Sequence, residues 1–171
     1  MLSRCRQAID DVIGGHRGRI FGTAGDNVIA EFPSAVEALR CAIQIQQRVQ
    51  DCNRDLPERS RMQFRIGVNL GDVIVTGSDL LGDGVNVAAR LEKLAEPGSI
   101  CISRSVFDQV EGKLDCHFVD LGAREVKNIA RPVHDLEPLR RRSLRRGLRR
   151  ARHPDPVGQL DHEVDSDIWQ V

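Results

Sequence analysis

The chain contains 171 residues with 25 basic and 25 acidic side chains, and 40% of its residues are apolar. This length allows one domain with a real core, and no apolar run approaches the ~18 residues that would span a bilayer. The first residues also lack the apolar segment of a secretory signal, so we expect a cytoplasmic protein without a transmembrane segment. The five cysteines are scattered without Cys-x-x-Cys spacing, which argues against a disulfide framework or a zinc site.

The balanced charge conceals two blocks of opposite sign near the C-terminus. Eight arginines lie between Arg140 and Arg152, and five acidic residues follow from Asp155 onward. We therefore divide the chain into one domain over 1–138 and an Arg-rich, then acidic, tail over 139–171, which we expect to be disordered. The alternative for the arginines is phosphate binding on nucleic acid or an acidic membrane surface. No aromatic residues interleave with them, so specific nucleic-acid binding is not expected.

Apolar periodicity and turn formers predict a series of short helices and strands. Hairpins, rather than helical crossovers, join neighbouring strands in this prediction, which favours an α+β fold over a doubly wound parallel sheet. In the first half of the chain we expect a helix over 3–14, a hairpin over 19–32, a helix from Ser34 to about Gln50 and a polar loop over 53–60. A hairpin over 63–75, with its bend at Gly71-Asp72, and a ligand-type loop over 76–83 follow. The remaining predicted elements are a helix over 84–95, a strand over 99–102, a helix over 103–110, and strands over 116–121 and 133–136.

The tract from Asp79 to Arg90 is the most informative part of the chain. It opens as an acidic, glycine-punctuated loop and continues into a helix, which Asp83 or a neighbour can cap through its side-chain oxygen. Asn86 and Arg90 stand four residues apart and project from one helix face. An amide and a guanidinium beside a loop carboxylate suit a ligand with hydroxyls, phosphate and a base. The alternative is a capped surface helix with a solvated polar stripe.

Four sequence motifs, in this order, carry a resemblance to a known family. They are Ala24-Gly25-Asp26 and the stretches 64–73, 82–92 and 126–133. From about Leu2 to about Pro138 the chain resembles the catalytic domain of class III nucleotidyl cyclases, and it looks most like the bacterial adenylate cyclase branch. The resemblance implies a ferredoxin-like antiparallel sheet covered by helices, a head-to-tail dimer, and conversion of ATP to 3′,5′-cyclic AMP and pyrophosphate in intracellular signalling.

The resemblance also implies a two-metal site for magnesium or manganese, the hard cations that carboxylates hold. In the family two aspartates bridge the metals, one on the first strand and one in the turn between the second and third strands. Asp26 matches the second aspartate, although on its own it is also an ordinary turn former. The first aspartate has no counterpart here, so we expect an N-terminally truncated domain whose first strand is missing.

Asp79, seven residues before Asn86, matches the carboxylate that recognises the purine in the family. A carboxylate there can accept a hydrogen bond from the adenine amino group. Its usual partner in the family is a lysine four residues before the metal aspartate. That position is Gly22 in this chain, so the preference for ATP over GTP is left open.

Three further positions correspond to nucleotide-binding residues of the family. Asn86 matches the amide that orients the ribose, and Arg90 matches the guanidinium that stabilises charge developing on the phosphate. Lys127 lies where the family keeps a triphosphate-binding lysine, with Ile129 as the alternative register. Asp72 and Asp83 are interpreted as turn and cap residues, and the five histidines have no ligand spacing.

Two functions from different classes remain in view. The first is a cyclase enzyme that rests on Asp26, Asp79, Asn86 and Arg90. In the family the metal aspartates come from one protomer and the Asn/Arg pair from the other, so this chain can act as a homodimer or beside an intact cyclase. The second is a catalytically deficient half that serves as a nucleotide-binding, dimerisation or regulatory module. A truncated product with an exposed sheet edge is the weakest alternative.

Overall fold

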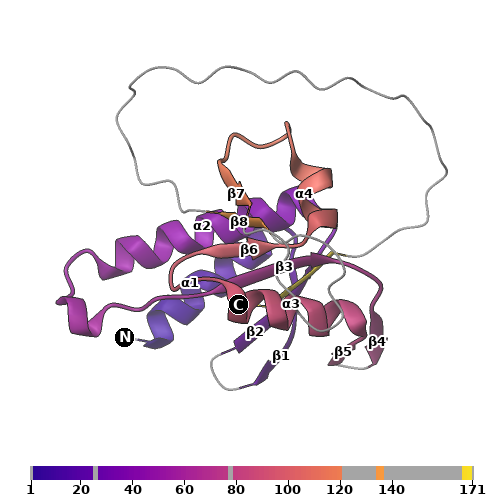
Figure 1. The fold of residues 1–171 in the computed structure, drawn as a ribbon. Helices are drawn as coiled ribbons and strands as arrows, with labels where there is room; N and C mark the ends of the chain where they lie inside the picture. Colours follow the sequence, from indigo (N-terminus) through magenta and orange to yellow (C-terminus); the bar gives the residue numbers. More distant parts are fainter. Residues whose placement is uncertain (1, 25–26, 77–78, 121–133, 137–166, 171) are drawn as a thin grey trace, which may run out of the picture.

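The structure is a computed structural model that describes residues 2–24, 27–76, 79–120, 134–136 and 167–170 (Figure 1). The described strands form a seven-stranded sheet in the order β1-β2-β9-β3-β6-β8-β7 and a separate two-stranded sheet, β4-β5. The helices are α1 (Leu2–Gly15), α2 (Ala35–Asn53), α3 (Asp83–Leu94) and α4 (Arg104–Val110), with a short 3-10 helix, η1 (Glu58–Ser60). The strands are β1 (Arg19–Ala24), β2 (Asn27–Phe32), β3 (Ile66–Leu70), β4 (Ile74–Thr76), β5 (Asp79–Leu81), β6 (Ile100–Ile102), β7 (Phe118–Asp120), β8 (His134–Leu136) and β9 (Asp167–Gln170).

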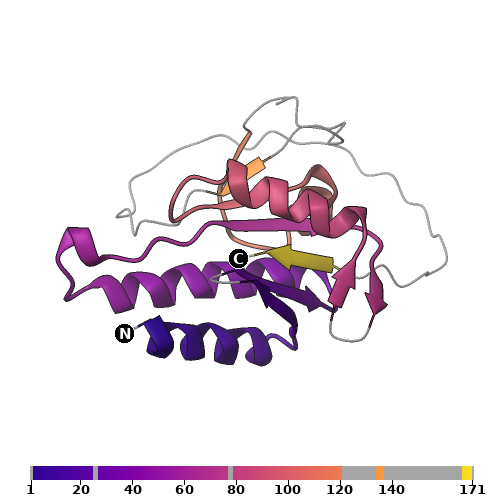
Figure 2. The same ribbon diagram turned by 90° about the horizontal axis from the view of Figure 1, so that it is seen from below.

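The main sheet separates two helical layers (Figure 2). Helices α1, α2 and α4 pack on one face and enclose the main core, which includes Leu39, Ile45 and Ile66. Helix α3 covers the other face, where it lies against β3, β9 and β6. Burial raises the pKa of the Cys41 thiol in the main core to about 12, so this cysteine packs as a protonated, apolar side chain. No helix among the described residues is long and apolar enough to cross a membrane.

Most of the helices and strands lie where the sequence predicts them, and the fold is α+β. The side chain of Ser34 caps α2 by accepting a hydrogen bond from the Glu37 N–H at 3.2 Å. Ser103 caps α4 in the same way through the Val106 N–H. The sheet is antiparallel except for β3 and β6, which are parallel because the chain returns between them through α3.

The predicted hairpin over 63–75 is wrong. Strand β3 lies in the main sheet between β9 and β6, whereas β4 pairs with β5 in the second sheet. Alternation of apolar with other residues over 63–70 favours a hairpin strand, but Gly67 and Asn69 are buried against α3 and the strand is covered on both faces. The predicted loop over 76–83 likewise contains strand β5, which forms the hairpin with β4.

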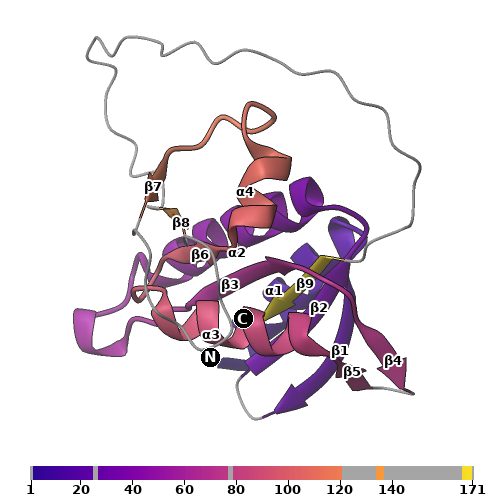
Figure 3. The ribbon, with the colours of Figure 1, turned by 45° about the vertical axis from the view of Figure 1, so that its right-hand side comes forward.

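Four residues of the predicted C-terminal tail are described by the structure. Residues 167–170 form β9, which lies between β2 and β3 and is antiparallel to both (Figure 3). The two flanking strands are therefore parallel to each other and are joined by α2, an arrangement known as a split β-α-β unit. The rest of the tail, and the 126–133 stretch, lie outside the described residues.

The backbones of β3 and α3 approach each other closely at Gly67. A Cβ atom at this position would lie 2.2 Å from the Ala88 carbonyl oxygen and 2.4 Å from the Glu92 nitrogen. Only a residue without a side chain allows the helix to lie this near the strand. This crossing fixes the height of α3, and of every side chain on it, above the sheet.

We expect Gly67→Val to lower the free energy of unfolding by about 3 kcal/mol or more, because the new side chain meets helix backbone that cannot move away locally. The matched control is Gly14→Ala in α1, where an added Cβ has no atom within 4 Å. The control should leave stability unchanged or raise it by up to about 1 kcal/mol. Urea denaturation followed by circular dichroism measures both changes, and equal stability of the two variants would contradict the close crossing.

A candidate nucleotide site at the start of α3

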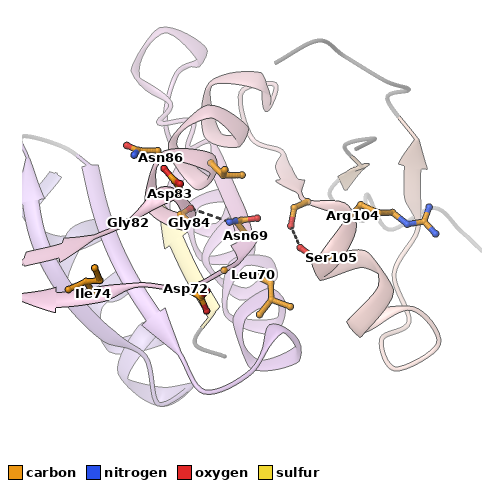
Figure 4. Close-up of a pocket in the computed structure, with 13 residues that line it drawn as sticks. Asn69, Leu70, Asp72, Ile74, Gly82, Asp83, Gly84, Asn86, Arg104 and Ser105 are labelled. Atoms are coloured by element: carbon orange, nitrogen blue, oxygen red, sulfur yellow. Dashed lines mark hydrogen bonds between the residues drawn. The ribbon is translucent and has the colours of Figure 1, made fainter. Parts of the chain in front are cut away.

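A groove of about 790 Å³ opens where α3 begins. Four elements border it: the end of β3, the start of the β4–β5 hairpin, the first turn of α3 and the start of α4 (Figure 4). It is lined by Asn69, Leu70, Gly71, Asp72, Ile74, Gly82, Asp83, Gly84, Asn86, Val87, Ser103, Arg104 and Ser105.

The first turn of α3 is held on the end of β3 by a buried hydrogen bond. The Asn69 side-chain amide donates to the Gly84 carbonyl oxygen at 3.2 Å, and only 6% of the Asn69 surface is exposed. Gly82 precedes the helix with a φ of 141°, a conformation that favours glycine. A Cβ at Gly82 would lie 2.9 Å from the Asp72 carbonyl oxygen. The backbone before α3 and the backbone at Asp72 are therefore in close contact at this side of the groove.

The start of α3 has no side-chain cap. Gly82 occupies the N-cap position and Asp83 is the first helical residue, so the expectation that Asp83 caps the helix is wrong. This first turn, whose N–H groups no side chain caps, borders the groove, and the positive end of a helix dipole favours an anion such as phosphate.

The charged side chains of the groove are arranged asymmetrically. Asp72 and Asp83 are exposed carboxylates that can accept hydrogen bonds from hydroxyl or amino groups. The Arg104 guanidinium is engaged on its own helix, where its Nε donates to Asp108 at 2.8 Å and the group lies 5.1 Å from the Phe107 ring centre. Figure 4 shows the Arg104 side chain directed away from the other groove residues. The groove therefore offers helix N–H groups to an anion and carboxylates to neutral donors.

Comparison with known proteins identifies this arrangement. Residues 1–136 match the family described as the Adenylate and Guanylate cyclase catalytic domain. The chain belongs to this family. It is 51% identical over 134 residues to "Putative adenylate cyclase 3" of Rhizobium meliloti (strain 1021), a match that covers 78% of the chain but only 23% of that relative.

Solved cyclase structures share the fold. An adenylate/guanylate cyclase/hydrolase from Silicibacter pomeroyi has a TM-score of 0.71 and 45% identity, with 77% of this chain and 78% of that chain covered. The adenylyl cyclase CyaB from P. aeruginosa has a TM-score of 0.64 at 21% identity, with 82% of each chain covered. These matches show that the sheet and helices described above form the nucleotidyl cyclase fold.

The structure brings one of the predicted site residues of this cyclase domain into the groove. Asn86 is exposed on the first turns of α3 and lines the groove. Arg90 is half-buried one turn further along α3 and is not among the groove residues. Asp79 begins β5 opposite Thr76, and only its backbone is described. Asp26 and Lys127 lie outside the described residues.

The metal site expected of a cyclase domain is not assembled by the side chains that the structure describes. No group of three or more His, Cys, Asp or Glu residues among them is arranged to hold a metal ion.

Asn69 is a site residue that sequence reasoning missed. The sequence predicts Asn69 only as part of the 63–75 hairpin, whereas its side chain holds the first turn of α3 by donating to the Gly84 carbonyl oxygen. The available signal was its neighbour Gly67. A glycine in a strand next to an uncharged amide is typical of a face on which another backbone lies close.

Replacing Asn69 with leucine should lower the free energy of unfolding by about 1–3 kcal/mol, because the buried Gly84 carbonyl oxygen loses its donor. Hydrogen–deuterium exchange should also speed up at the amides of residues 83–86, at the start of α3. The control is Gln47→Leu on the exposed side of α2, which we expect to change stability by less than about 0.5 kcal/mol. Exchange at α3 that matches the parent chain would show that Asn69 does not hold this turn.

Proposed function

We propose that this cyclase domain binds ATP at the start of α3 and contributes Asn86 and Arg90 to an active site that forms 3′,5′-cyclic AMP and pyrophosphate. The observation that carries the proposal is the placement of this Asn/Arg pair on one helix whose uncapped first turn opens into a groove. Helix α3 is fixed to the sheet at Gly67 and Asn69, so the pair is held on a rigid element.

Each residue of the pair has a defined chemical task in this proposal. The Asn86 amide both donates and accepts hydrogen bonds, so it can fix the ribose with its 3′ oxygen directed at the α-phosphate. The Arg90 guanidinium presents paired N–H donors to the phosphate oxygens, on which negative charge grows as the new bond forms. The helix N-terminus adds a favourable potential for the phosphates.

The complete site is proposed to form between two protomers, either in a homodimer or beside an intact cyclase. An exposed apolar pair on the β4–β5 hairpin supports this pairing. Ile74 and Leu81 are cross-strand partners, and they are 67% and 56% exposed. Leu80, on the other face of the hairpin, is buried against Phe21. One face of the hairpin thus packs on its own domain, and the other presents apolar surface to a partner.

The remaining contacts follow from the family resemblance. We propose that Asp79 accepts a hydrogen bond from the adenine amino group, that Lys127 binds the triphosphate and that Asp26 is a ligand of magnesium or manganese, which would neutralise the phosphates. The position that pairs with Asp79 is Gly22 in β1, so this chain offers the purine fewer side-chain contacts. Free thiols at the described cysteines suit a reducing cytoplasm and a role in intracellular signalling.

The strand order favours a second candidate function, a nucleotide-binding or regulatory half without turnover of its own. The strand beside β2 in the main sheet is β9, and Asp167 stands opposite Phe32 at the end of β2. The other end of β2, at Asn27, lies about 17 Å away along a strand that rises about 3.3 Å per residue. Strand β9 therefore places no carboxylate beside the start of β2, and we expect little cyclic AMP from this chain alone.

The test is a complementation assay with ATP and manganese. The partner is the catalytic domain of the Rhizobium meliloti relative with the residue aligned to Arg90 changed to alanine, so that only this chain supplies the guanidinium. Adding the chain should restore cyclic AMP formation, and Arg90→Ala should reduce the restored rate by about 100- to 1,000-fold. Arg48→Ala, at an exposed position of α2, is the matched control and should leave the rate unchanged.

The outcomes separate the two functions. Restored turnover that depends on Arg90 supports the donor role, whereas restored turnover that survives Arg90→Ala removes it. Nucleotide binding without restored turnover supports the regulatory half. Rapid cyclic AMP formation by the chain alone would overturn the expectation that it needs an intact partner.

A further inference from the structure

Strand β9 is the only described link between the two halves of the main sheet. Within the described residues β2 pairs with β1 and β9, and β3 pairs with β6 and β9, but β2 and β3 do not pair with each other. Neighbouring strands lie about 4.8 Å apart, so β2 and β3 are separated by one strand width filled by β9. Without that strand the sheet would divide into β1-β2 and β3-β6-β8-β7.

The backbone pairing on both sides of β9 is continuous. The four residues from Asp167 to Gln170 stand opposite the run from Phe32 back to Ile29 on one side, and opposite the run from Leu70 back to Gly67 on the other. Emptying this position would leave two facing rows of unpaired N–H and C=O groups inside the domain. Such groups are costly when buried and readily pair with any extended segment of suitable length.

The residues that flank β9 show that both faces of this position are covered. Trp169 stands opposite Ala30 and Val68, which are buried in the main core under α1 and α2. Ile168 stands opposite Asn69, on the face that α3 covers, and α3 packs directly along β9. An extended segment in this position therefore has neighbouring elements over both of its faces.

The occupant is short and lies at the end of the chain. Strand β9 contains four residues and is joined to β8 through residues 137–166. A connection of this length reaches up to ~100 Å when fully extended. It therefore allows the same strand to enter the position in its own domain or in that of a second copy, and tethering favours the first by a high effective concentration.

We propose that the space between β2 and β3 is a strand-acceptor site, which binds one extended segment antiparallel to both strands, and that residues 167–170 are an exchangeable occupant. The partner that the site fits is a β-strand peptide of this sequence, supplied by the same chain or by a second copy. This mode of recognition uses main-chain hydrogen bonds for affinity and alternate side chains for selectivity.

Trp169 is the only tryptophan of the chain, so its fluorescence reports on the occupant directly. The test uses the full chain and the variant Ile168→Pro, which keeps Trp169 but removes a backbone donor from the middle of β9. A fluorescein-labelled peptide covering residues 165–171 is titrated against each, with binding followed by anisotropy. The peptide should bind the variant at least tenfold more tightly than the parent chain, whose own strand competes.

Two controls make the result specific to the strand. A peptide carrying the same proline should not bind, and Gln159→Pro, in the segment before β9, should behave like the parent chain. Acrylamide should quench Trp169 more strongly in Ile168→Pro than in the parent. Equal peptide affinity for the parent chain and the variant, or binding to neither, would overturn the proposal.

A second experiment covers the case in which Ile168→Pro does not fold. The double variant Glu31→Cys/Ile168→Cys places thiols at directly opposed positions of β2 and β9, within the Cβ separation that cross-strand pairs have. Mild oxidation followed by peptide mapping should recover this 31–168 disulfide, within one chain or between two. Glu31→Cys/Trp169→Cys, one register step away and hence on opposite faces of the sheet, should give none. Failure to recover the 31–168 bridge from folded protein would contradict the placement of the occupant.

Discussion

At Gly67 the backbone of β3 passes so close to α3 that any side chain would strike the Ala88 carbonyl oxygen. This contact sets the position of the helix that carries both members of the Asn86/Arg90 pair. One turn away, the buried Asn69 amide holds the start of the same helix through the Gly84 carbonyl oxygen. The groove is a consequence of these two contacts, because they decide where the uncapped N–H groups of α3 point. The site therefore depends on backbone packing at least as much as on the side chains that face the ligand.

The described groove holds only part of what the proposed cyclisation needs. It offers the start of a helix, an amide and two exposed carboxylates, but the described residues form no cluster for a metal ion. In the proposed function a partner supplies the remaining ligands. The exposed Ile74–Leu81 pair lies on a hairpin whose opposite face is fixed to the domain by Leu80 and Phe21. Such a hairpin can present apolar surface without loosening the fold that holds α3.

The continuity of the main sheet is a separate matter from the groove, although α3 connects them. The helix packs on β3 and on β9 together, so the layer that carries Asn86 and Arg90 rests partly on the last described strand of the chain. Strand β9 comes late in the sequence and lies in the middle of the sheet. Both of its neighbours, β2 and β3, must therefore be in position before it can pair with them. The split β-α-β unit formed by β2, α2 and β3 provides that frame, since α2 fixes the two strands on either side of the position that β9 fills.

Local sequence patterns determined much of this protein. The helices α1 to α4, the serine caps of α2 and α4, the β1–β2 hairpin and the helical spacing of Asn86 and Arg90 all follow from interactions within a few residues. The family motifs are likewise contiguous stretches of sequence. Tertiary structure decided the rest. The pairing of β4 with β5 rather than β3, the burial of Asn69 and the insertion of β9 between β2 and β3 depend on partners distant in the sequence. Alternation of apolar and polar residues does not reveal such distant partners. A strand that is buried on both faces can have a glycine and a hydrogen-bonded amide on one face, as β3 does at Gly67 and Asn69. Composition likewise indicates a polar C-terminal tail. Four residues within it nevertheless form a strand, because β2 and β3 offer backbone groups with which they can pair.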